Sequence, residues 1–214
     1  MTKVRSQIAM SLDGFVAGPN QSEENPLGEG GEQLHEWVFE LEAFNKTHGR
    51  EGGVVNESTP IVEGMFANVG AVIMGRNMFG PIRGDWGDES WNGWWGDDPP
   101  YHVPTYVLTH HARDSVEMQG GTTFHFVTDG PQAALDRARS AAGAQDVLVM
   151  GGAQCQQQFL ALGVIEEMII SLAPVLLGSG ERLLANLGDK PPGLEQVDSI
   201  KAPGVTHLKY TLST

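Results

Sequence analysis

Residues 147–153 read Val-Leu-Val-Met-Gly-Gly-Ala, and this stretch carries the strongest structural signal in the sequence. Four apolar residues without alternation are typical of a strand that is covered on both faces. Two glycines follow, and apolar spacing predicts a helix from about Ala153 to Leu162. Because glycine lacks a Cβ, a phosphate could approach the backbone N–H groups where that helix starts, and the helix dipole would attract its charge. The alternative is that the two glycines only close a tight turn.

Similar apolar runs and amphipathic segments alternate along the rest of the chain. Strands are predicted at 3–10, 71–74, 105–108, 124–127 and 168–177, and helices at 32–45, from Thr59-Pro60 onward and between Gly130 and Gly143. The tail, 196–212, alternates loosely and predicts two antiparallel strands. Strands that alternate with helices indicate an α/β domain with a largely parallel sheet. Since neither an internal repeat nor a linker is evident, we expect residues 1–214 to form a single domain.

The charge balance argues against two classes of partner. The 214 residues include 13 Lys and Arg against 27 Asp and Glu, a formal net charge of −14. Nucleic acids and anionic membrane surfaces are bound by clustered basic side chains. We therefore expect no nucleic-acid partner and no membrane partner, and a small molecule as the substrate.

Cysteine usage and hydropathy point to a cytoplasmic location. The single cysteine, Cys155, cannot form an internal disulfide, and no apolar stretch reaches 18 residues. The start of the chain does not resemble a secretory signal. The seven histidines lack zinc-ligand spacing, so no metal is expected.

Three more predicted strands end in polar groups, and ligands of open α/β sheets bind beyond the carboxyl ends of strands. Residues 11–18 place the Asp13 carboxylate in a turn, 75–78 place Arg76 beside a helix start, and 109–113 bring a threonine, two histidines and an arginine. Each has a plain alternative. Aspartate favours turns, arginine forms surface ion pairs, and the third segment could be a polar loop.

At this point the motifs resemble a known family. They occur in the order found in dihydrofolate reductases, at 8–17, 72–76, 106–109 and 147–153 with 158–160. The Ser-Leu-Asp-Gly start at 11–14 and the segment 174–180 look still more like the C-terminal reductase domain of the bacterial deaminase-reductase of riboflavin biosynthesis. The likeness covers most of the chain, apart from inserted segments at about 19–58 and 81–103.

The resemblance implies a fold and a cofactor. The fold is three-layer α/β/α with a central, mostly parallel mixed sheet and an antiparallel C-terminal strand pair, and NADPH lies across the carboxyl ends. The residues near the cofactor phosphates are Gly75, Arg76, Asn77 and Met78, with Thr109 and His110 at the adenosine 2′-phosphate. The pyrophosphate is received by Gly151, Gly152, Ala153 and Gln154. The nicotinamide packs near Ala9, Val16 and Ala17, and Asp13 lies on the substrate side as the catalytic candidate.

The chain departs from these families at two points. Dihydrofolate reductases carry an acidic residue where this sequence has Thr59, with Glu57 and Glu63 as near neighbours. The zinc-binding deaminase part of the riboflavin enzymes has no counterpart among these residues. We therefore expect an NADPH-dependent reductase with a small polar heterocyclic or carbonyl/imine substrate, and the alternative is a non-catalytic NADP(H)-binding module.

Two further expectations concern surfaces. The tryptophan-rich segment 81–104 is interpreted as a lid over the reacting face; the alternatives are a cover for hydrophobic surface and a subunit contact. The apolar run 168–177 and the relatives of this fold suggest a homodimer, although a buried central strand would explain the run equally well.

Overall fold

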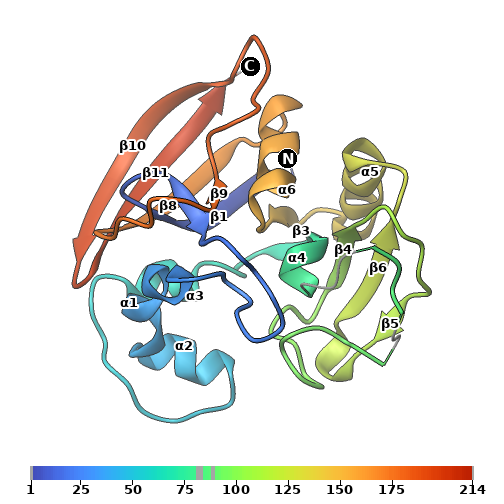
Figure 1. The fold of residues 1–214 in the computed structure, drawn as a ribbon, viewed down its shortest axis with the longest axis horizontal. Coiled ribbons are helices and arrows are strands. Elements are labelled where there is room, and N and C mark those ends of the chain that lie inside the picture. The colour runs from blue at the N-terminus through green and yellow to red at the C-terminus, as the bar shows by residue number, and fades with distance from the viewer. Residues whose placement is uncertain (1, 81–83, 88–89, 214) are drawn as a thin grey trace.

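The computed structural model describes residues 2–80, 84–87 and 90–213, and a large mixed sheet runs through it (Figure 1). Its strand order is β10-β11-β8-β1-β7-β3-β4-β6-β5, and neighbours from β8 to β6 run parallel. The bounds are β1 Val4–Ser11, β3 Val69–Gly75, β4 Pro104–Leu108, β5 Val116–Glu117, β6 Thr123–Val127, β7 Asp146–Val149, β8 Glu167–Ala173, β10 Gly193–Ala202 and β11 Val205–Ser213. A small second sheet pairs β2 (Phe15–Ala17) with β9 (Glu181–Arg182). The predicted antiparallel C-terminal pair is confirmed as β10 and β11.

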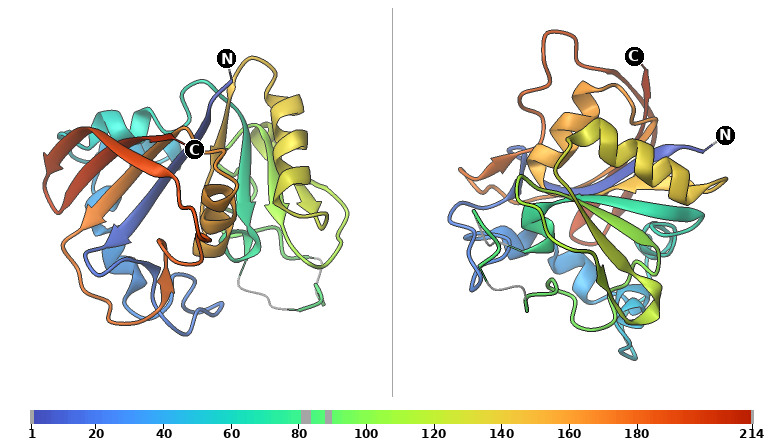
Figure 2. Two further views of the ribbon diagram at one scale, coloured as in Figure 1. Left: turned by 90° about the horizontal axis from the view of Figure 1, so that it is seen from above. Right: turned by 90° about the vertical axis from the view of Figure 1, so that its right-hand side faces the viewer.

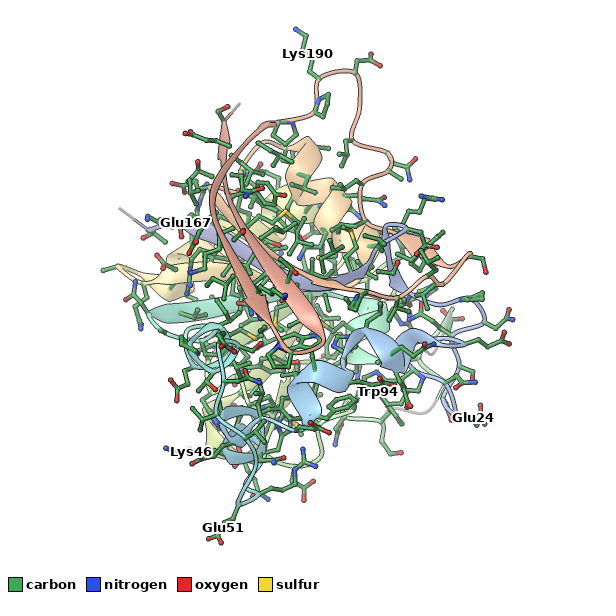
Figure 3. All side chains as sticks on the ribbon, turned by 90° about the vertical axis from the view of Figure 1, so that its left-hand side faces the viewer. Glu24, Lys46, Glu51, Trp94, Glu167 and Lys190 are labelled. Carbon is green, nitrogen blue, oxygen red and sulfur yellow. The ribbon has the colours of Figure 1, made fainter. Side chains whose placement is uncertain are left out.

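Helices cover both faces of the sheet, which confirms the predicted three-layer α/β/α fold (Figure 2). One face carries α5 (Pro131–Ala142) and α6 (Ala153–Ala161). The other side carries the short 3-10 turn η1 (Gly31–Leu34) and the helices α1 (Glu36–Phe39), α2 (Glu42–Thr47) and α3 (Thr59–Glu63). The remaining short elements are α4 (Arg76–Phe79) and η2 (Gln119–Gly121). Labelled charged side chains such as Glu51 and Lys190 project from the periphery in Figure 3.

The central strands are apolar throughout because both of their faces are buried. In β3, Ile73 belongs to the core beneath α5 and α6, whereas the adjacent Met74 belongs to the core on the opposite face. Both side chains are fully buried. Burial of each such side chain contributes about 1.5–3 kcal/mol. The lack of alternation in the sequence therefore reflects a two-sided core.

The tryptophan-rich segment contributes to the core on the second face. Trp86 is buried and lies edge-on to Phe79 and Phe126, with ring centroids 5.8 and 5.0 Å away. Trp95 meets the buried Tyr101 at 6.1 Å. These contacts favour the interpretation that the tryptophans cover hydrophobic surface over the interpretation as a lid; residues 81–83 and 88–89 lie outside the described part.

The prediction of one helix over 32–45 is wrong, because the segment divides into η1, α1 and α2. Leu41 adopts an extended conformation (φ −75°, ψ 136°) between the two α-helices. A returning strand-like residue, Val54, exchanges backbone hydrogen bonds with Glu40 and Glu42, at 2.8 and 3.0 Å. This close approach requires glycine at Gly53, where φ is +124° and a Cβ would lie 2.8 Å from the Glu40 carbonyl oxygen. Long-range pairing therefore interrupts a stripe that is periodic in the sequence.

Two other boundaries are corrected. The strand predicted over 168–177 is β8 and ends at Ala173, because Pro174 has no N–H group to donate to a neighbouring strand. The helix that begins at Thr59 is only five residues long. Within the described residues, no helix is long and apolar enough to cross a membrane.

Candidate active site

Four segments singled out in the sequence meet at one edge of the sheet. They follow the carboxyl ends of β1, β7, β3 and β4, which are consecutive neighbours in the strand order. Because these strands are parallel, their ends lie at the same edge. The topology thus brings to one edge residues such as Ser11 and Gly151, which are 140 positions apart in the sequence.

The centre of this edge is the junction of β7 with β3. Gly75 donates its N–H group to the Gly151 carbonyl oxygen at 2.8 Å, and the Gly151–Gly152 peptide bond is cis. A Cβ on Gly75 would lie 3.2 Å from the Cβ of Cys155, so α6 packs tightly there. A Cβ on Gly152, by contrast, would meet nothing within 4 Å. The backbone at Gly152 is therefore open on the side where α6 begins.

The start of α6 fits an anion. The helix runs over nine residues, and Gly152 precedes it in extended conformation with no side-chain cap. Ala153 is buried and Gln154 is exposed, so only small or outward-pointing side chains flank the first turn. The unpaired N–H groups of a first helical turn and the helix dipole favour a phosphate at such a position.

Arg76 follows Gly75 and is held against the aromatic core. Its guanidinium carbon lies 3.7 Å from the centroid of the Trp86 ring, and its Nη1 donates to the Gly84 carbonyl oxygen at 2.5 Å. Arginine stacks on aromatic faces because its charge is delocalised over a plane. The stacking fixes the orientation of a cation at the carboxyl end of β3, and it is a contact that sequence spacing did not indicate.

The next two residues of α4 close the junction from the other side. Asn77 donates to the Gln21 side chain at 3.5 Å, which links α4 to the 19–30 loop. The sulfur of Met78 lies 3.6 Å from the position of a Cβ on Gly151. Met78 therefore borders the glycine junction, Asn77 contacts the loop beside it, and the predicted proximity of both residues to cofactor phosphates stays a prediction.

The end of β4 forms a hydrogen-bonded turn. The hydroxyl group of Thr109 accepts from the N–H group of His111 at 3.2 Å, and the His111 ring pairs with Asp85 at 2.8 Å. Trp86 donates its indole N–H to the His111 carbonyl oxygen at 2.9 Å, so this turn is bonded to the ring on which Arg76 stacks. His110 is exposed beside it. The predicted 2′-phosphate residues thus neighbour the predicted phosphate arginine.

The Asp13 carboxylate has structural partners in the described chain. It accepts hydrogen bonds from the Ser11 hydroxyl at 2.6 Å and from the N–H groups of Leu177 and Gly178 at 3.1 and 2.7 Å. These bonds, that of Ser11 first, lower the pKa of Asp13 to about 2. An ionised carboxylate that fastens the 176–178 loop is poorly suited to donate a proton, so the geometry favours a positioning role.

The apolar end of the site consists of Ala9, Val16 and Ala17, and all three are buried. Leu34 of η1 packs against Ala9 and Ala173. Because these side chains are small and apolar, a flat ring such as the expected nicotinamide could pack close to the backbone at this end of the site. Their contact with a cofactor stays a prediction.

Sequence reasoning missed the segment that closes this end. β9 pairs with β2, and the guanidinium group of Arg182 lies 4.4 Å from the Phe15 ring and donates to the Asp13 carbonyl oxygen at 3.3 Å. Gln157 of α6 donates to the Arg182 carbonyl oxygen at 2.7 Å. The sequence offered one sign of a tight turn before this segment, Gly180. In the structure its φ is +129°, a conformation that only glycine adopts readily.

The strand order, with parallel strands from β8 to β6 and the antiparallel pair β10 and β11, is that of a dihydrofolate reductase-like fold. Residues 2–208 match the family described as the RibD C-terminal domain, and the chain belongs to that family. None of the curated proteins matches the chain in sequence.

Several solved structures share the fold. A protein assigned to riboflavin biosynthesis in Shewanella sp. PV-4 superposes with a TM-score of 0.66 at 22% identity, over 100% of both chains. The riboflavin biosynthesis reductase Rib7 of Saccharomyces cerevisiae gives a TM-score of 0.51 at 13% identity, over 100% of this chain and 89% of its own.

The deaminase/5-amino-6-(5-phosphoribosylamino)uracil reductase of Thermotoga maritima gives a TM-score of 0.59 at 13% identity. The match covers 99% of this chain but only 56% of the Thermotoga protein. At these identities the likeness is one of fold, and the activities in the names are those of the relatives.

Proposed function

We propose that the protein is an NADPH-dependent reductase that transfers a hydride to a small polar heterocyclic or carbonyl/imine substrate. Membership of the RibD C-terminal domain family supports a reductase of the kind found in riboflavin biosynthesis. The observation that carries the proposal is the open backbone at Gly152 at the start of α6, with Arg76 held on Trp86 at the neighbouring strand end.

The residues of the edge fit each part of the cofactor. The backbone at Gly152 and the first turn of α6 would hold the pyrophosphate, and Arg76 would neutralise phosphate charge. Thr109 and His110 would hold the 2′-phosphate that distinguishes NADPH from NADH. The buried wall of Ala9, Val16 and Ala17 would exclude water from the nicotinamide. When bound, NADPH supplies the hydride.

The substrate would lie on the side of β1, opposite the cofactor. Hydride transfer needs close and oriented reactants rather than a strong acid, so positioning by the chain is the main requirement. The proton would come from solvent or from an uncharged side chain, because Asp13 is ionised and occupied and Glu57 and Glu63 are exposed. Candidate acceptors are 5-amino-6-(5-phosphoribosylamino)uracil, by analogy with the Thermotoga relative, and dihydrofolate.

A second function is a non-catalytic NADP(H)-binding module. The observation in its favour is the lack of a free carboxylate at the position of Thr59, which is buried and accepts the Asn56 N–H at 3.0 Å. Such a module would retain the proposed NADP(H)-binding residues at the carboxyl edge of the sheet, but it would not catalyse hydride transfer.

Two measurements test these functions in sequence. Ligands that bind only the folded state raise the unfolding temperature, so saturating NADPH should raise it more than NADH does. If neither cofactor changes the unfolding temperature, both proposed functions are overturned. Loss of NADPH absorbance with one of the candidate acceptors identifies the reductase. A clear shift without turnover of any candidate favours the binding module.

We also propose that the protein is a cytoplasmic homodimer. The apolar run 168–177 is weak evidence for a dimer, because β8 lies between β1 and β11 inside the sheet, and this position accounts for its apolar side chains. Sedimentation equilibrium measures the assembly directly, and a mass of 23.0 kDa at micromolar concentration would contradict the dimer.

A further inference from the structure

Within the described residues, two guanidinium groups lie over the indole ring of Trp86. The guanidinium carbon of Arg76 is 3.7 Å from the ring centroid, and that of Arg113 is 5.1 Å from it. Arg76 begins α4 at the end of β3, whereas Arg113 belongs to the segment that follows β4. One buried ring thus connects two neighbouring strand ends of the candidate site.

The Arg113 guanidinium group lies among three aromatic rings. Besides Trp86, the rings of Phe126 and Phe79 have their centroids 5.1 and 5.6 Å from its central carbon. The rings also pack edge-on against one another, because Trp86 meets Phe79 at 5.8 Å and Phe126 at 5.0 Å. Arginine suits such a position, since its charge is spread over a plane that stacks on aromatic faces. The Arg113 side chain is therefore part of the aromatic core around Trp86.

Hydrogen bonds fix both Arg113 and the ring beneath it. Nη1 of Arg113 donates to the Trp91 carbonyl oxygen at 2.7 Å, and Nη2 donates to the Asn92 side-chain oxygen at 3.3 Å. The indole N–H group of Trp86 donates to the His111 carbonyl oxygen at 2.9 Å. The segment after β4 thus holds the ring at two places, through the His111 carbonyl group and the Arg113 guanidinium group.

The orientation of Arg76 depends on this ring. Arg76 stacks on Trp86 and bonds to the Gly84 carbonyl oxygen, so its long side chain is ordered before any ligand arrives. A side chain that is already ordered loses less conformational freedom on binding, and the affinity is higher for that reason. If Trp86 moved, Arg76 would lose this advantage. Arg113 is one of the groups that keep Trp86 in place.

We propose that Arg113 is a positioning residue for cofactor recognition, which holds Trp86 where the indole orients Arg76 for a phosphate of NADPH. This inference rests on the proposed function, in which Arg76 binds a cofactor phosphate. Arg113 itself does not touch the cofactor in this proposal. Its contribution to affinity is made through Trp86 and Arg76.

The test is a double-mutant cycle on the whole protein, with the Kd for NADPH measured by fluorescence titration where every variant is folded. R113A should weaken NADPH binding by about three- to tenfold, which is the cost of ordering one long side chain on binding. In the R76A background the same substitution should change the Kd by less than twofold, because the side chain that Arg113 positions is absent. Simple loss of folded protein would not depend on Arg76 in this way.

A second variant and a matched control complete the cycle. R113M keeps an apolar stem among the rings but lacks the guanidinium group, so it should give the same pattern if R113A does not fold. In protein labelled with 5-fluorotryptophan, the Trp86 resonance, identified by its absence in W86F, should move in R113M. The control is R50A, because Arg50 also lies over an aromatic ring, that of Phe44 on α2 at 5.7 Å. R50A should leave the Kd for NADPH unchanged.

The outcomes separate this inference from the proposed function. If the substitutions of Arg113 leave the Kd within twofold of the wild-type value, or weaken binding by the same factor with and without Arg76, the inference is overturned while the proposed function stands. Equal factors would mean that Arg113 does not act through Arg76. Failure of the wild-type protein to bind NADPH overturns the proposed function itself.

Discussion

Replacing Arg76 by alanine tests the link between the aromatic core and the cofactor edge. The side chain has two roles in the structure. Its guanidinium group stacks on Trp86 at 3.7 Å and bonds to the Gly84 carbonyl oxygen, and its backbone directly follows Gly75, which bonds to Gly151. In the proposed function the same group binds a cofactor phosphate. The first role concerns stability and the second concerns ligand binding, so the substitution should change two separate quantities.

The magnitudes follow from the contacts. An arginine–aromatic stack contributes about 0.5–2 kcal/mol, so R76A should lower the free energy of unfolding of the cofactor-free protein by about 1–2 kcal/mol. A charge-assisted bond to a phosphate contributes about 1.5–3 kcal/mol, which corresponds to a roughly 10- to 150-fold weaker Kd for NADPH. The loss should be smaller at high ionic strength, because salt already screens the pair.

The assay is a titration of NADPH fluorescence at a temperature where wild type and variant are both folded, together with urea unfolding of each. The control is R137A, because Arg137 lies on α5 and pairs with the exposed Asp129 at 2.7 Å. It should leave the Kd unchanged and lower stability by less than about 1 kcal/mol. If the Kd of R76A for NADPH lies within twofold of the wild-type value, Arg76 does not bind a cofactor phosphate. Its role would then be limited to packing on Trp86.

Three further predictions concern other named groups. His207 is fully buried between the Ser58 and Ser171 hydroxyls, and burial lowers its pKa to about 4. As the pH falls below 6.5, His207 takes up a proton in the unfolded state before it does so in the folded state, so the free energy of unfolding should fall between pH 6.5 and 4, by up to about 3 kcal/mol. Urea unfolding should show a weaker pH dependence of stability in H207Q than in the wild type. Equal pH dependence in the two proteins would contradict the lowered pKa of His207. In D13N the amides of Leu177 and Gly178 should exchange faster with deuterium, whereas wild-type exchange with slowed hydride transfer would return Asp13 to a catalytic role. Burial raises the pKa of Cys155 to about 12, so at pH 8 a maleimide should modify the native thiol on the order of a hundredfold or more slowly than the urea-unfolded thiol.

The elements that the sequence predicted correctly are those whose signal is local. The strand at 147–150 and the helix after the glycine pair were recognised because apolar runs and glycines act within a few residues. The four candidate segments were found for the same reason, since each directly follows an apolar run and carries its own glycines or polar groups. Parallel topology then places all of them at one edge.

The errors arise where distant residues decide the local conformation. The stripe over 32–45 is helical in its periodicity, but Val54 engages the Glu40 carbonyl oxygen and the Glu42 N–H group, and Leu41 between them is extended. Similarly, the tryptophans near Arg76 looked like a lid, because nothing in the sequence shows that Phe79 and Phe126 offer them a buried surface.

By itself, the amino-acid sequence determined the fold class, the strand ends and the glycine junction, because these follow from hydrophobic period and from the absence of a Cβ. Only the tertiary structure decided which polar groups are free. It tied the Asp13 carboxylate to the Leu177 N–H group, 164 residues away in the sequence, and it stacked Arg76 on an indole. The physical reason is that a side chain's availability depends on every group packed around it, and those groups come from the whole chain.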